Sequence, residues 1–87
     1  MNWKLMPNED AIRTNIDCND RIIHGLVYTC ILTGQYKWMA WVHGDNIVKA
    51  VNDELYANVF DAMRVAESTM LSISDEIQSV SAIWQEV

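Results

Sequence analysis

Four side chains of this sequence could bind a metal or act as a nucleophile: Cys18, His24, Cys30 and His43. Thiolates and imidazoles are zinc ligands, and a cysteine beside a histidine can attack a carbonyl carbon. None of the four forms a close pair of the kind that zinc sites contain, such as two cysteines separated by two residues. We therefore expect no metal, no cofactor and no catalytic residue. The two cysteines are then buried apolar side chains of a reducing cytoplasm, with a disulfide or a metal pair as the alternative.

The carboxylates indicate no acid–base pair either. Most fall on the outer side of a predicted helix, where water keeps their pKa values ordinary. The sequence also lacks a glycine-rich phosphate loop, a nucleophile elbow and a calcium loop. We expect a protein that is not an enzyme.

The charge of the chain is concentrated in its second half. The net charge is −6, and residues 44–87 contain eight acids against two bases, while residues 1–43 are balanced. Such a surface repels nucleic-acid phosphates and attracts basic protein surfaces. No run of about 18 apolar residues is present, and the first residues do not resemble a signal peptide. We expect a cytoplasmic protein that binds neither nucleic acid nor membrane.

Residues 1–51 have the alternation of β-strands. Residues 11–18 alternate apolar and polar types, residues 22–32 are rich in β-branched and aromatic types, residues 36–42 alternate again, and residues 47–51 can form a short last strand. Turn residues separate these segments. The simplest pairing is an antiparallel meander of three or four strands.

Residues 52–87 have the period of a helix, which Asn52 or Asp53 could cap. Apolar residues follow steps of four and three without interruption: Val59, Met63, Ala66, Met70, Ile73, Ile77, Val80, Trp84 and Val87. An amphipathic helix that packs on a sheet has the same spacing. The 87 residues are thus one α+β domain, a β-meander (1–51) followed by a helical segment (52–87) on one sheet face.

The length of the helical segment leaves two alternatives. One helix over residues 54–87 would be about 50 Å long, whereas a folded chain of this size is roughly 31 Å across. Either the helix breaks near Ser72–Ser74, with Ser74 as a second cap, or one long helix overhangs the sheet and a second chain covers its apolar stripe.

The segment "YKWMAWV" (36–42) places its two tryptophans on opposite faces of a strand. A sheet with one helical layer has one covered face and one open face, so both indoles cannot lie in the same core. We assign Trp38 to the covered face, since Ala40 beside it lets a helix approach, and Trp41 with Met39 to the open face. Either a partner binds there, or the N-terminal segment with Trp3 folds over that face.

Two segments carry a resemblance. The "W-x-A-x-V" pattern in "WMAWV" (38–42) and the acidic helix "VFDAMRVAES" (59–68) resemble a class of very small phage and mobile-element proteins that place a β-meander before an acidic helix. That class includes anti-CRISPR proteins. The resemblance therefore implies a non-enzymatic inhibitor that occupies the nucleic-acid groove of a host defence complex.

Two functions follow as expectations. The first is an acidic inhibitor that binds a partner with a basic surface, through these residues: Trp41, Met39, Asp61, Glu67, Asp75 and Glu76. The second is a structural or regulatory homodimer, assembled along this seam: Met70, Ile73, Ile77, Val80 and Trp84. Oligomerisation would add stability to so short a chain.

Overall fold

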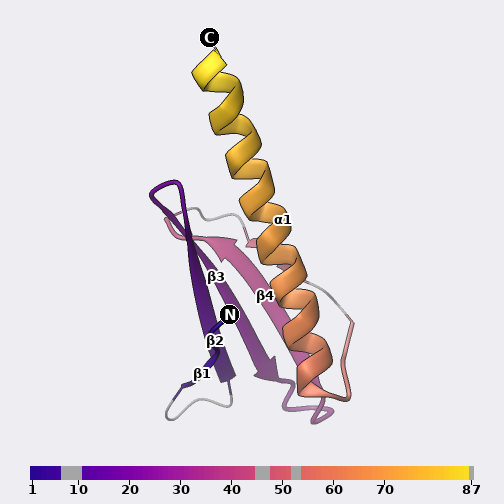
Figure 1. Ribbon diagram of the computed structural model, residues 1–87. Coiled ribbons are helices and arrows are strands. Elements are labelled where there is room, and N and C mark those ends of the chain that lie inside the picture. Colours follow the sequence, from indigo (N-terminus) through magenta and orange to yellow (C-terminus); the bar gives the residue numbers. More distant parts are fainter. Residues whose placement is uncertain (7–10, 45–47, 52–53, 87) are drawn as a thin grey trace.

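A computed structural model describes residues 1–6, 11–44, 48–51 and 54–86, with the backbone only for residues 48–51 and 80–86. Its elements are β1 (Lys4–Leu5), β2 (Ala11–Cys18), β3 (Arg21–Thr29), β4 (Tyr36–Val42), β5 (Val48–Val51) and α1 (Val59–Glu86). The strands form one antiparallel sheet in the order β1-β2-β3-β4-β5, and α1 crosses one face of it (Figure 1). The predicted α+β meander with a C-terminal helix is confirmed, and the two-residue strand β1 is an addition at the edge.

The turns have the residues that their backbone requires. Asn19 and Asp20 join β2 to β3 with φ values of 50° and 65°. Two successive residues at positive φ are the signature of a tight hairpin turn whose twist matches that of the flanking strands. Gly34 and Gly44, at φ 72° and 85°, lie in the next two connections. Asn46, which also belonged to the predicted turn after β4, lies outside the described residues.

The core lies between α1 and the covered face of β2, β3 and β4. The sheet contributes Ile23, Val27, Trp38, Ala40 and Val42, and the helix contributes Ala62, Ala66, Met70 and Ile73, all buried. Small side chains at Ala40, Ala62 and Ala66 allow the helix backbone to approach the sheet. The assignment of Trp38 to the covered face is confirmed.

The helix begins later than the sequence pattern predicts. Asn58 is its cap, because its Oδ1 accepts a hydrogen bond of 2.8 Å from the Phe60 amide. Residues 54–58 precede the helix because Tyr56 is held to β4: the Tyr56 and Tyr36 amides each donate to the other's carbonyl, at 2.9 and 2.8 Å. The predicted caps, Asn52 and Asp53, lie outside the described residues, and the boundary at residue 52 is wrong by about two helical turns.

No break occurs in α1 at Ser72–Ser74, so the helix is continuous, as the second alternative predicts; the second chain of that alternative stays a prediction. Ser74 does not cap a second helix because its side chain faces β2, where its hydroxyl contacts the Cys18 thiol at 3.3 Å. At 28 residues the helix is about 42 Å long, and strands of nine residues or fewer extend at most about 30 Å. Its C-terminal part therefore projects beyond the sheet (Figure 1), and the molecule measures 50 × 25 × 22 Å.

Candidate protein-binding surfaces

The two histidines meet on the open face of the sheet, whereas the two cysteines are far apart. His24 Nε2 lies 3.1 Å from His43 Nδ1. Cys18 is buried under α1 at one end of β3, and Cys30 follows the other end of that nine-residue strand. Among the described residues, no three His, Cys, Asp or Glu side chains are placed to hold a metal ion.

Trp41 determines the surroundings of His24. The two rings are stacked, with centroids 5.2 Å apart and an interplanar angle of 26°. Burial lowers the pKa of His24, and the nearby His43 and Arg13 lower it further, because each disfavours a second positive charge. His24 is thus predominantly neutral at pH 7.

The open face of the sheet is apolar at its centre. Trp41, Met39, Leu26 and Tyr28 are half-buried there, on neighbouring positions of β3 and β4. The structure thus places Trp41 and Met39 on the uncovered face, as the alternation predicts. Their role in binding stays a prediction.

In the part of the N-terminal segment that the structure describes, residues 1–6, nothing covers Trp41, so that alternative is wrong. Trp3 instead packs against the core on the helix side, and its Nε1–H donates a hydrogen bond of 2.6 Å to Glu67 Oε1. Thr14 Oγ1 also donates to the Asn2 carbonyl at 2.9 Å. The N-terminal segment is therefore tied along the edge of β2 toward α1.

The four acids proposed for partner binding do not form one face. Glu67 is engaged by Trp3, and Asp61 is paired with Arg64 on the same helix. Glu67 and Glu76 are nine positions apart, which places them about 180° apart around a helix. Asp75 and Glu76 are exposed, so the acidic surface is smaller than the sequence pattern suggested.

The proposed dimer seam is also shorter. Met70 and Ile73 are buried against the sheet of their own chain and offer no surface to a second chain. Ile77 is half-buried and packs at the margin of the core. Val80 and Trp84 lie on the projecting part of α1, and their side chains are outside the described part of the structure.

The most exposed apolar side chains lie at the end of the sheet where α1 begins. Ile31 and Leu32 are 97% and 93% exposed at the tip of the β3–β4 turn. We call these two, with three further exposed residues nearby, the apolar end: Leu5, Ile31, Leu32, Leu55 and Phe60. The pairing of Thr29 with Tyr36, and of Tyr36 with Tyr56, brings the turn, residues 54–58 and the start of α1 together at the lower end of Figure 1.

A groove of about 210 Å³ opens beside the apolar end. Leu5, Val27, Tyr36 and Val59 are among the residues that line it, and its walls are mainly apolar. The sequence pattern missed this surface because "CIL" (30–32) extends the apolar run of β3 and was assigned to that strand. The Thr-Gly pair at residues 33–34 was correctly assigned to the turn, but it follows Ile31 and Leu32 and gives no signal that the strand ends at Thr29.

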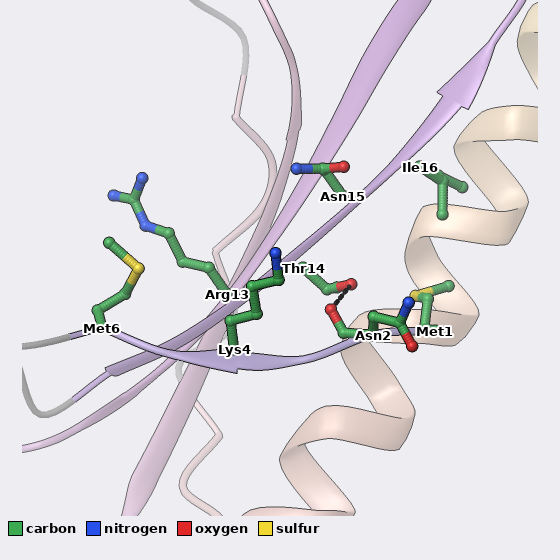
Figure 2. A pocket seen from close by; sticks show the side chains of 8 residues that line it. All are labelled: Met1, Asn2, Lys4, Met6, Arg13, Thr14, Asn15 and Ile16. Carbon is green, nitrogen blue, oxygen red and sulfur yellow. Dashed lines mark hydrogen bonds between the residues drawn. The ribbon is translucent and has the colours of Figure 1, made fainter.

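A second cavity, of about 550 Å³, lies between the N-terminal segment and β2 (Figure 2). Lys4 and Arg13 provide its charged side chains, and none of its described lining residues is acidic. The remaining lining residues are Met1, Asn2, Met6, Thr14, Asn15 and Ile16.

Comparison with known proteins identifies no relative: no protein-family model, curated sequence or solved structure matches this chain. Within the described residues, α1 lacks the length of uninterrupted apolar sequence with which a helix crosses a bilayer.

Proposed function

We propose that this chain is a non-enzymatic protein-binding module whose apolar end enters a groove of its partner. The observation that carries this proposal is the near-complete exposure of Ile31 and Leu32. Burying an aliphatic side chain of this size contributes about 1.5–3 kcal/mol, so a pair reaches the scale of a binding hot spot.

The turn itself does not need these two side chains. Its conformation is held by the backbone, since the Cys30 carbonyl accepts hydrogen bonds from the Thr33 and Gly34 amides, at 3.3 and 2.8 Å, and the Cys30 amide donates to Gln35 O at 2.7 Å. Polar residues would serve equally well at a solvated turn tip. Two adjacent aliphatic residues there favour a contact with another protein.

The specific form that we propose is an inhibitor of a nucleic-acid-handling defence complex, encoded by a phage and acting in the cytoplasm of its host. The resemblance of residues 38–42 and 59–68 to that class supports this form. Asp75 and Glu76, exposed beyond the middle of α1, are the acids best placed for a basic partner surface. Trp41 and Met39 provide a second apolar contact on the open face.

The test compares three tagged chains expressed in the host cell: the parent, the double variant I31S/L32S, and the control L71S. Leu71 is 54% exposed on the outer side of α1, away from the apolar end, so L71S removes a similar side chain from a different surface. Circular dichroism checks that each variant is folded. We expect the partner to co-purify with the parent and L71S and to be reduced at least about tenfold with I31S/L32S. Equal recovery with all three chains would overturn the proposed contact.

The inhibitor form has its own test. The double charge reversal D75K/E76K should weaken binding to a basic partner, and the loss should shrink as salt is raised, because exposed charges are screened. A partner that binds the reversed chain equally well at low salt would rule out the electrostatic part.

One observation favours a second candidate function, a homodimer. The C-terminal part of α1 projects beyond the sheet (Figure 1), and the apolar spacing of the sequence continues there through Ile77, Val80 and Trp84. Sedimentation at micromolar concentration should then give twice the 10.0 kDa mass, and I77D should return the mass to that of one chain. A parent that sediments as a monomer at that concentration would eliminate this candidate.

A further inference from the structure

The cavity between the N-terminal segment and β2 has the features of a ligand site. Its volume, about 550 Å³, lies within the range of small-molecule pockets. Figure 2 shows the Lys4 and Arg13 side chains rising from the two strands, with the Asn15 amide on the same side and Met1 and Asn2 at one end.

The charges in this cavity are unusual for so acidic a chain. The protein contains twelve acids and six bases, yet the part of the cavity lining that the structure describes has two bases and no acid. Among the described residues, neither Lys4 nor Arg13 forms an ion pair with a carboxylate. A bound anion would therefore face no competing carboxylate from the described lining residues.

The strand register adds an independent observation. Lys4 of β1 and Arg13 of β2 are direct cross-strand partners. Like charges in directly opposed positions destabilise a sheet, and such local conflicts in native proteins are typical of functional sites. An anion between the two side chains would convert their repulsion into attraction to a common ligand.

We propose that this cavity binds a small organic acid, an oxyanion carried on a short apolar body. Arg13 offers the planar fork of donors that matches a carboxylate, and Lys4 adds a second positive charge. Asn2 and Asn15 supply side-chain amide donors, and Met1, Met6 and Ile16 form the apolar part of the lining. A carboxylate can thus be held at the cationic pair while its hydrocarbon portion contacts Met6, which lies beside Arg13 in Figure 2.

The experiment is a titration of the ¹⁵N-labelled protein, followed by NMR, with three probes: hexanoate, acetate and inorganic phosphate. We expect hexanoate to give saturable shifts at the amides of Lys4, Arg13 and Asn15, at lower concentrations than acetate or phosphate. The variants K4M and R13M should each weaken hexanoate binding about tenfold or more, since each removes a charge-assisted hydrogen bond. The control K37M changes a cation of β4 that does not line the cavity, and should leave the affinity unchanged.

Three outcomes would overturn the proposal. The absence of a saturable shift with every probe would show that the cavity is not an anion site. Tighter binding of phosphate than of hexanoate would show that the site does not recognise an apolar ligand body. Equal loss in K4M, R13M and K37M would show only a general charge effect. A further variant, E9Q/D10N, changes two acids that lie outside the described residues. Binding by that variant and not by the parent belongs with the first outcome and also overturns the proposal, because the parent chain then binds no organic acid.

Discussion

Gly25 of β3 and Met70 of α1 are in direct contact across the core. A Cβ atom built on Gly25 would lie 2.5 Å from Met70 Sδ and 3.3 Å from Thr14 Cγ2. Met70 is fully buried, so its side chain has little room to move away. The absence of a side chain at residue 25 therefore lets the helix lie close to the sheet at this point.

The variant G25A should lower the free energy of unfolding by about 1–3 kcal/mol, the usual range for overpacking a core. M70A should lower it by about 2–5 kcal/mol, because it leaves a cavity. The double variant should be less destabilised than the two single losses predict when added, since the cavity accommodates the new methyl group. Urea denaturation measures all three. Strict additivity would contradict the contact.

The hydrogen bond from Trp3 to Glu67 joins residues 64 positions apart and ties the N-terminal segment to the helix. W3F should lower the free energy of unfolding by about 1–2 kcal/mol, because it removes a partly buried bond to a charged acceptor. E67A should cost a similar amount, and the double variant little more than either single change. D75A is the control, since Asp75 is exposed on the same helix. A loss in D75A as large as that in E67A would show that helix charge, and not this bond, is responsible.

His24 makes stability depend on pH. Its pKa in the folded state is lowered below the ordinary value of 6.5, by burial and then by His43 and Arg13. Between that lowered pKa and 6.5 the unfolded chain binds more protons than the folded chain. The contribution of His24 to the free energy of unfolding is complete above pH 6.5. The protein should therefore become less stable as the pH falls from 6.5 through the folded-state pKa of His24.

An NMR titration of the His24 ring measures this shift directly. R13M and H43Q should each bring the pKa of His24 closer to 6.5, because each removes a positive or protonatable neighbour. H24Q should flatten the dependence of unfolding free energy on pH below 6.5. A His24 pKa at or above 6.5 in the parent would refute the prediction.

Cys30 should be the reactive thiol of this chain. Its pKa is lowered, first by a hydrogen bond with the Thr33 side chain and then by the Leu32 backbone, whereas Cys18 is buried under α1. Near neutral pH a larger fraction of Cys30 than of an ordinary cysteine is therefore thiolate, which is the form that iodoacetamide alkylates. In single-thiol variants, Cys30 should react rapidly in the folded protein and Cys18 only on unfolding.

The hydroxyl group at residue 33 can be tested separately. T33V should slow alkylation of Cys30, and T33S, which keeps the hydroxyl, should preserve the rate. Equal rates in both variants would mean that the hydrogen bond from residue 33 does not determine the reactivity.

Several features of this fold follow from local sequence periodicity. The alternation in residues 36–42 correctly separates Trp38 from Trp41, because successive side chains of a strand point to opposite faces. The apolar steps along α1 correctly identify Ala66, Met70 and Ile73 as its buried side, because residues three and four apart share one face of a helix. These predictions succeed because one element is enough to define each of them.

The errors arise where a second element is involved. Serine is a common helix cap, but Ser74 instead contacts Cys18, which lies on strand β2, 56 positions earlier in the chain. Asn58 is the cap in place of an earlier residue because Tyr56 pairs with Tyr36 and delays the helix. Glu67 was predicted to be a solvated acid, but its carboxylate accepts a hydrogen bond from Trp3.

The sequence by itself determined which residues of each strand and of the helical segment are apolar, and hence that a helical segment would cover one face of a meander. Only the tertiary structure decided that Ile31 and Leu32 are exposed at a turn, that Lys4 and Arg13 are paired on adjacent strands, and that α1 projects past the sheet. The physical reason is that periodicity repeats within a single element, whereas strand register, edge pairing and the length of the sheet beneath the helix depend on contacts between segments far apart in the chain.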